Sequence, residues 1–262
     1  MHSDNLFPLM DYDPDPTAII EPSIGCKPAN VPEHCVICFF AEVIETIVSQ
    51  FHARVIASSQ SEIGQHPLYE IEYKGRRLAF FHPGIGAPLA VGLLEEMIAF
   101  GCRKFIACGG AGVLNAEIAL GHLMVPQFAY RDEGTSYHYL PPSQKVEMNP
   151  NALKAIIETL ESNKLPYILG STWTTDAIYR ETKGKAAKFK EMGVSSVEME
   201  AASFMAVAQF RNVPFGQILY GGDSVIESGW DSRKWNSRAD IRQQLFWLAA
   251  DACFAIKEED NA

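Results

Sequence analysis

The chain has 262 residues, of which 47% are hydrophobic and 21% are charged. This composition is typical of globular proteins, and it excludes a wholly disordered, collagen-like or coiled-coil chain. The 22 basic residues are outnumbered by 32 acidic residues, which leaves a net charge of −10. Because nucleic acids and anionic membranes select basic surfaces, we expect neither nucleic acid nor membrane as a partner.

Two further features predict a cytoplasmic location. No apolar run approaches the roughly 18 residues of a membrane span, and the N-terminal run MHSDNLFPLMDYDPDP lacks the basic and apolar regions of a signal peptide. The six cysteines lie mostly in apolar stretches, which indicates reduced, structural thiols. Cys35 and Cys38 form a CxxC motif beside His34, but no second ligand pair accompanies it, so we predict no metal site.

The first 32 residues differ from the rest of the chain. They contain six of the fifteen prolines, and proline at this density cannot continue a helix or an inner strand. We therefore predict a Pro-rich N-terminal arm over residues 1–32, lying on the surface, and a single domain over residues 33–262.

After Pro32 the chain alternates between strand and helix patterns. Apolar runs typical of strands covered on both faces predict strands at 36–40, 54–58, 68–73, 77–82, 104–109, 122–130, 166–172, 195–199 and 215–221. Amphipathic runs with start and stop signals predict helices at 88–101, 149–162, 200–210 and 237–257. In the last of these, Ser237 and Asp240 indicate a capping box. This alternation predicts an α/β layered fold, in which ligands bind beyond the carboxyl ends of the strands.

Two carboxylates, Glu198 and Glu200, flank Met199 where a strand runs into a helix. Residues two apart in an extended segment project to the same side, so this pair could accept hydrogen bonds from adjacent hydroxyls such as a ribose diol. The alternative is a pair of solvated glutamates that the dipole of the following helix favours. The residues alone leave both interpretations open.

Asp223 follows an apolar strand and two glycines. A carboxyl at a strand end near apolar walls can hold a proton and deliver it, although an ordinary turn aspartate has the same pattern. Two glycine turns, at 82–88 and 108–113, also follow strands. Neither completes GxGxxG, so a dinucleotide-dependent oxidoreductase is not supported, and we interpret both turns as places where the backbone passes close to a small ligand.

Taken in order, these segments resemble the nucleoside phosphorylase superfamily, which includes uridine phosphorylase, hexameric purine nucleoside phosphorylase and methylthioadenosine nucleosidase. The resemblance covers roughly residues 33–255. It implies a three-layer α/β/α sandwich around a mixed, partly barrel-like central sheet. The motifs that carry it are VEMEAA (197–202), PGIGAP (83–88), GGAG (109–112), AYRDEGTSYHY (129–139) and TTDAIY (174–179).

The resemblance implies roles for the carboxylates singled out above. Glu200 would hold the ribose hydroxyls with Glu198 assisting, Met199 would pack on the sugar, and Asp223 matches the aspartate with which purine-specific members protonate the leaving base. The wall around the base would be formed by Ile178, Gly110 and Ala111. The uridine enzymes read uracil with a glutamine and an arginine beyond TTDAIY, where this chain has Arg180, Glu181 and Thr182.

The chain departs from the resemblance where the phosphorylases bind phosphate. Cys38, Phe39 and Phe40 stand in place of a Gly-Asp-Pro loop, and Glu42 stands where an arginine is expected. A carboxylate at this place repels phosphate. The nucleosidases have a glutamate near this position that activates water, which makes Glu42 a candidate general base; the alternative is an ordinary first-turn glutamate.

Two side chains could still serve an anion site or the pocket rim. Arg131 lies at the end of a long strand, and His82 lies directly before PGIG. Structural roles, such as an ion pair for Arg131, are the alternative.

We therefore expect an enzyme that cleaves the N-glycosidic bond of a nucleoside, with Asp223 favouring a purine base. The nucleophile would be phosphate as co-substrate or, given the altered loop, water, and no other cofactor is expected. The alternative is a non-catalytic protein that binds a nucleoside through the same ribose contacts. By analogy with the family, we expect a homodimer or homohexamer.

Overall fold

A computed structural model describes residues 7–226 and 228–257. Within these residues, five strands close into a barrel-like sheet at the centre of the molecule. In spatial order they are β5 (Lys104–Val113), β10 (Phe215–Ile226), β6 (Leu123–Asp132), β8 (Tyr167–Thr175) and β9 (Ser196–Glu198). The barrel closes because β5 pairs in parallel with β10 and antiparallel with β9.

The sheet extends beyond the barrel on the β5 side. There β1 (His34–Cys38) pairs in parallel with both β5 and β4 (Arg76–Phe81), and β3 (Gly64–Tyr73) and β2 (Arg54–Ser61) follow antiparallel. Two short strands, β7 (Lys145–Glu147) and β11 (Gly229–Asp231), pair with β6 and β10 respectively.

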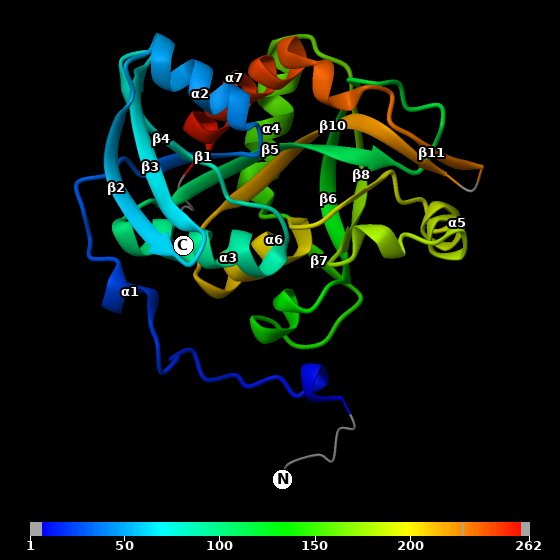
Figure 1. The fold of residues 1–262 in the computed structure, drawn as a ribbon, viewed down its shortest axis with the longest axis horizontal. Helices are drawn as coiled ribbons and strands as arrows, with labels where there is room; N and C mark the ends of the chain where they lie inside the picture. Colours follow the sequence, from blue (N-terminus) through cyan, green and yellow to red (C-terminus); the bar gives the residue numbers. More distant parts are fainter. Residues whose placement is uncertain (1–6, 227, 258–262) are drawn as a thin grey trace.

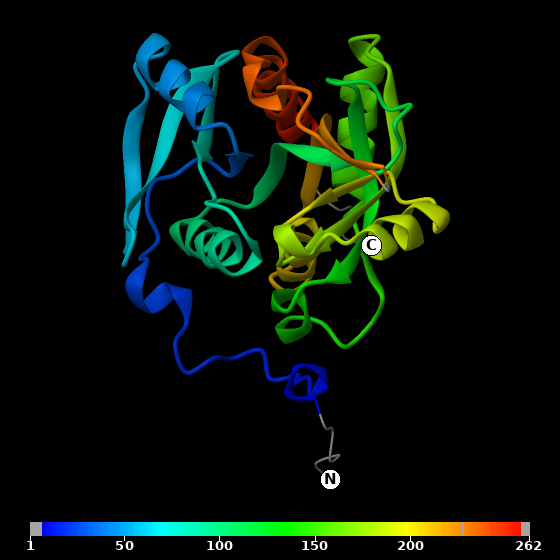
Figure 2. The same ribbon diagram turned by 45° about the vertical axis from the view of Figure 1, so that its right-hand side comes forward.

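Helices cover the sheet on two sides (Figures 1 and 2). On one side lie α2 (Ala41–Gln50), α4 (Pro150–Ser162) and α7 (Ala239–Ala255), and on the other lie α3 (Ala87–Phe100) and α6 (Ala201–Phe210). The helix α5 (Lys183–Glu191) lies outside the barrel, where its Phe189 stacks on Trp173 of β8. The predicted three-layer sandwich with a mixed, partly barrel-like sheet is confirmed.

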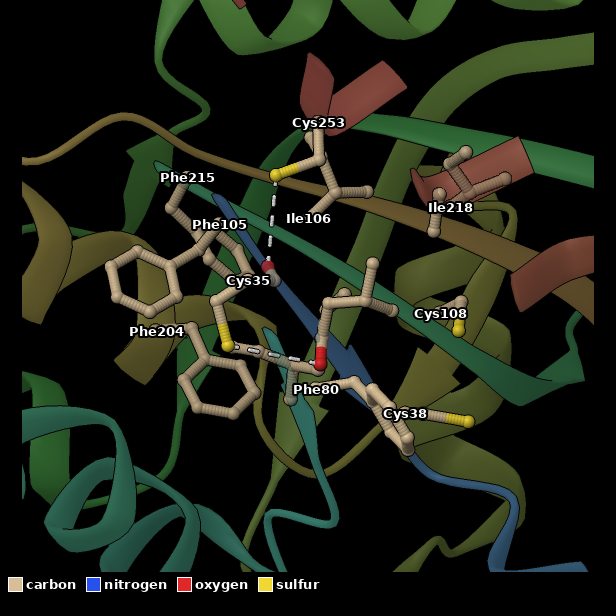
Figure 3. Close-up of a cluster of buried hydrophobic side chains, with 14 of the residues drawn as sticks. Cys35, Cys38, Phe80, Phe105, Ile106, Cys108, Phe204, Phe215, Ile218 and Cys253 are labelled. Atoms are coloured by element: carbon tan, nitrogen blue, oxygen red, sulfur yellow. Dashed lines mark hydrogen bonds between the residues drawn. The ribbon is translucent and has the colours of Figure 1, made fainter. Parts of the chain in front are cut away.

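Cysteine thiols fill part of the core between the sheet and its helices, together with aromatic rings such as Phe80, Phe105 and Phe204 (Figure 3). All six cysteines are buried and free. The Cys253 thiol donates to the carbonyl of Lys104 at 3.4 Å, and burial raises the pKa of Cys35. Thiols in such surroundings stay protonated and unreactive, in agreement with the structural role predicted from their apolar stretches.

All nine predicted strands are present, with ends that differ by a few residues. The strands β7 and β11 and the helices α2 and α5 are not among the predicted elements. The two strands are short and α5 has little apolar periodicity, whereas α2 was implied only by the interpretation of Glu42 as a first-turn glutamate. The prediction of a capping box at Ser237 is wrong. A short 3-10 turn, Trp235–Ser237, precedes the helix, and the Ser237 hydroxyl donates to the carbonyl of Lys234 instead. The helix α7 begins at Ala239 without a side-chain cap.

The described part of the arm, residues 7–32, runs along the outside of the domain (Figures 1 and 2). It holds a 3-10 turn, Pro8–Met10, and the short helix α1 (Pro22–Gly25), which packs near α3. The Ala29 amide donates to the carbonyl of Phe100, while Ile19 is wholly exposed. Within the described residues, no helix combines the length and the apolarity that a membrane crossing requires.

Candidate functional site

Glu198 lies at the junction between β9 and α6 and is 8% exposed. Its carboxylate accepts hydrogen bonds from the Thr174 hydroxyl at 2.6 Å and from the amides of Glu200 and Ala201 at 2.8 and 2.6 Å. These amides belong to the start of α6, whose dipole favours a negative charge. Burial nevertheless raises the pKa of Glu198 to about 7, against the hydrogen bonds, which lower it. Glu198 therefore supports the local structure with both of its oxygens.

Glu200 is also buried, at 5% exposure, but its main contact lies far away in the sequence. The Gly86 amide, in the loop after β4, donates to Glu200 Oε1 at 2.6 Å. Gly86 has a φ of +89° with open space where a Cβ would lie, a conformation that favours glycine. Burial, and then the nearby charge of Glu198, raise the pKa of Glu200 to about 8. The PGIG turn and the Glu-Met-Glu motif thus meet at one place.

A third buried carboxylate, Glu133, lies behind this pair and was not predicted. It accepts hydrogen bonds from the Ser203 hydroxyl at 2.6 Å and from the Ser136 amide at 2.9 Å. The Ser136 hydroxyl also donates to it. Its negative charge contributes to the raised pKa of Glu198. The only sequence signal was its place in AYRDEGTSYHY, one of the motifs that carried the resemblance.

Arg131 lies near the end of β6 and is buried under the loop that follows this strand. Its guanidinium donates to the hydroxyls of Ser136 and Ser143, both at 2.8 Å, and to the carbonyls of Pro141 and Leu140 at 2.8 and 3.2 Å. These bonds brace the loop after β6. The geometry favours the structural alternative for Arg131 over a place in an anion site.

Asp223 lies near the end of β10, where the antiparallel β11 folds back over it. The indole of Trp230 donates to Asp223 Oδ2 at 2.6 Å. A Cβ placed on Gly112 of β5 would lie 3.5 Å from Asp223 Oδ1 and 3.1 Å from Val197, the residue before Glu198. Gly112 therefore lies between Asp223 and the strand that leads into the Glu-Met-Glu motif, which places both at the same end of the barrel.

Glu181 faces Asp223 from the segment between β8 and α5. It is half-buried, and burial followed by the charge of Asp223 raises its pKa to about 7. Two carboxyl groups thus adjoin at this end of the site. Ile178, three residues earlier, is 54% exposed on a 3-10 turn, Ile178–Arg180. Met199 is partly buried between the two glutamates that flank it.

Gly110 and Ala111 lie on β5 beside the same strand ends. A Cβ on Gly110 would lie 3.1 Å from the Tyr220 ring, and one on Gly109 would lie 3.1 Å from Phe39. The predicted turn at 108–113 is wrong, because these residues continue β5 as far as Val113. Packing against these rings is sufficient to explain the two glycines. Ala111 is buried at 6% exposure.

Glu42 occupies the first turn of α2, directly beyond the end of β1. Its side chain is 45% exposed and pairs with Arg242 of α7, with 2.9 Å between Oε1 and Nη1. His82 lies nearby: its Nδ1 accepts from the Gly84 amide at 3.0 Å. Burial lowers the pKa of His82 despite the charge of Glu42, so its imidazole is neutral at physiological pH. Nothing local in the sequence marked Arg242, which lies 200 residues after its partner.

A hollow of about 530 Å³ lies elsewhere, lined by residues that include Glu33, Lys104 and Asn149. Lys104 begins β5, whereas the predicted site residues follow the strand ends. This hollow contains none of them, and the carboxylates described above remain the candidate site.

A family model matches residues 33–242; its description is "Phosphorylase superfamily". The chain belongs to the phosphorylase superfamily. It is 27% identical over 209 residues to a uridine phosphorylase of Thermococcus kodakarensis, a match that covers 74% of each chain. It is 28% identical over 154 residues to a guanosine phosphorylase of Halorubrum lacusprofundi, which covers 59% of this chain and 64% of that relative.

Solved structures show the same superfamily fold. An AMP nucleosidase from Bacteroides thetaiotaomicron superposes with a TM-score of 0.71 at 21% identity, covering 89% of this chain and 92% of the other. A uridine phosphorylase from Vibrio fischeri superposes with a TM-score of 0.70 at 23% identity, covering 87% and 92%. The relatives found by sequence are thus named phosphorylases, and the fold is shared with a protein named as a nucleosidase.

Proposed function

We propose that this protein cleaves the N-glycosidic bond of a purine nucleoside by hydrolysis. In this proposal Glu200, with Glu198 behind it and Met199 against the sugar, binds the ribose hydroxyls. Asp223 protonates the departing base, Ile178 and Ala111 contribute to the wall around the base, and Glu42 accepts a proton from the attacking water. No cofactor takes part.

We choose water as the nucleophile because of the charged group that follows β1. The phosphorylases resembled by this chain place a cation there for phosphate, whereas Glu42 places a carboxylate there, already paired with Arg242 at 2.9 Å. This pair is close to neutral, so it offers a phosphate much less attraction than an unpaired arginine would. Water does not need a cation to bind, and a carboxylate is a suitable acceptor for its proton.

The other carboxyl groups match the charges that the reaction develops. Breaking the bond leaves positive charge on the sugar and negative charge on the base. Buried carboxylates near the ribose stabilise the first in a site with little water, and a proton from Asp223 neutralises the second. Glu181, with a pKa of about 7, holds a proton beside Asp223 during part of the time at neutral pH.

Phosphorolysis is the second candidate, because relatives of similar sequence are named guanosine phosphorylase and uridine phosphorylase. Non-catalytic binding of a nucleoside is the third. The three are separated by incubating the protein with inosine, adenosine, methylthioadenosine or uridine, with and without phosphate, and measuring the free base by chromatography.

We expect release of a purine base at the same rate with and without phosphate. Release that requires phosphate would replace hydrolysis by phosphorolysis. A nucleoside that raises the melting temperature without any release would support the binding protein. Asp223→Asn should lower kcat by about 10²–10⁴-fold with little change in KM, the range for loss of a general acid. The matched control is Asp231→Asn, an exposed aspartate on β11, which should leave kcat unchanged.

A further inference from the structure

Arg242 is a buried charge that the packing of its helix does not require. Its side chain is only 10% exposed, on the side of α7 that faces the sheet. A methionine or leucine would fill such a place without the cost of removing a guanidinium from water. The reason for an arginine must therefore lie in the groups that it contacts.

Two aromatic rings enclose the guanidinium. Its Cζ lies 4.5 Å from the centre of the Phe40 ring and 5.8 Å from that of Trp235. Nη1 donates to the carbonyl of Asn236 at 3.4 Å, a weak bond. Among the described residues, the buried Nε has no hydrogen-bond partner. The local structure thus satisfies only part of the guanidinium, and the carboxylate of Glu42, at 2.9 Å, is its strongest contact.

This contact lies beside the candidate site. Phe40 and Glu42 both follow the end of β1, and the charge of Glu42 also acts on His82 of the loop after β4. The charges of Arg242, Glu42, Asp223 and Arg238 all act on Tyr220 of β10. Arg242 therefore connects α7 to the strand ends where the nucleophile is proposed to enter.

We propose that Arg242 is the positioning residue for Glu42, an inference that rests on the proposed function. An exposed glutamate in the first turn of a helix samples several rotamers. The guanidinium holds Oε1 in one place and leaves Oε2 to accept the proton of water. Because Arg242 is itself packed between two rings, it provides a rigid support.

The test is a double-mutant cycle, measured as base release from the best-cleaved purine nucleoside without phosphate. Arg242→Met keeps the aliphatic packing and should lower kcat about 10–30-fold with KM changed less than about 2-fold. Arg242→Lys keeps a charge and should retain more kcat than Arg242→Met. Glu42→Gln should lower kcat about 10²-fold. The pair Arg242→Met with Glu42→Gln should be no slower than Glu42→Gln alone, since Arg242 acts through Glu42.

The control is Arg54→Met. Arg54 lies on the edge strand β2, and its partner Glu70 also pairs with Arg77, so its loss should leave kcat unchanged. If the losses of Arg242→Met and Glu42→Gln multiply in the double variant, Arg242 does not act through Glu42 and the inference fails while the proposed function stands. If Glu42→Gln alone leaves release unchanged, the proposed general base fails and the inference fails with it. Should Arg242→Met not fold, the same cycle with Arg242→Lys decides between these outcomes.

Discussion

The carboxylates at the two ends of the candidate site differ in burial and in the groups that they contact. At the sugar end, Glu198 and Glu200 are buried and held by amides and a hydroxyl, and their pKa values are raised. At the nucleophile end, Glu42 is half exposed and paired with an arginine from a distant helix. The buried end holds the Glu-Met-Glu motif on which the resemblance rests, whereas the exposed end holds Glu42 where the resemblance leads us to expect an arginine. Burial makes the sugar-end carboxylates costly to keep, so their presence indicates function more strongly than that of Glu42.

The largest loss of activity is expected from a substitution at the end proposed to bind the sugar. Such a loss would strengthen the contrast between the buried and the exposed carboxylates. Glu200→Gln should lower kcat/KM for a purine nucleoside about 10²–10³-fold, because the carboxyl group can ionise on binding the ribose hydroxyls and accept with both oxygens, whereas an amide has one acceptor oxygen. Steady-state kinetics will show this as a rise in KM together with a fall in kcat. Glu191→Gln, a substitution of an exposed glutamate at the end of α5, is the control. A kcat/KM within threefold of wild type would remove Glu200 from the ribose site.

The same substitution should make the protein more stable at high pH. The pKa of Glu200 rises from 4.5 to about 8 on folding, so the folded state binds the extra proton and the free energy of unfolding falls as pH rises between these values. A glutamine cannot ionise. Glu200→Gln should therefore match wild type near pH 4.5 and exceed its free energy of unfolding by about 1–3 kcal/mol at pH 8.5 in urea titrations.

At the exposed end, the corresponding change should have the opposite sign. Glu42→Gln leaves the Arg242 guanidinium, which is only 10% exposed, without its carboxylate, so it should lower the free energy of unfolding by about 1–3 kcal/mol. Equal stabilisation by both substitutions at pH 8.5, or destabilisation by Glu200→Gln there, would contradict the contrast between a desolvated and a solvated end.

The smallest effect concerns the base end, where Glu181 adjoins Asp223. Glu181 is protonated below a pKa of about 7 and becomes negative above it, beside a group that must deliver a proton. Glu181→Gln stays neutral at every pH. Like charges disfavour each other, so ionised Glu181 helps Asp223 keep its proton at high pH, and the glutamine lacks this help. The ratio of the variant's kcat to that of wild type should therefore fall about 3–10-fold between pH 6 and pH 8.5. A ratio that is flat across this range, like that expected for Glu191→Gln, would exclude coupling of Glu181 to the acid.

Local patterns were sufficient for most of the architecture. Apolar runs marked most strands of the barrel, because strands covered on both faces are apolar along their length. The short strand β9, Ser-Val-Glu, is the exception. The helix start at Ser237 was predicted wrongly because the capping pattern also fits a tight turn, and the turn Trp235–Ser237 forms there instead. Glu133 was overlooked because a carboxylate in a polar loop gives no signal of burial until Ser136 and Ser203 enclose it.

The sequence by itself determined the alternation of strands and helices and the Glu-Met-Glu motif at a strand end, since both depend on residues within a few positions of one another. Only the tertiary structure decided which of these carboxylates face each other and what each one contacts. The bond from Gly86 to Glu200 spans 114 residues, and the pairing of Glu42 with Arg242 spans 200. Such contacts depend on how the barrel closes and how α7 packs on it, which is set by the burial of the whole core.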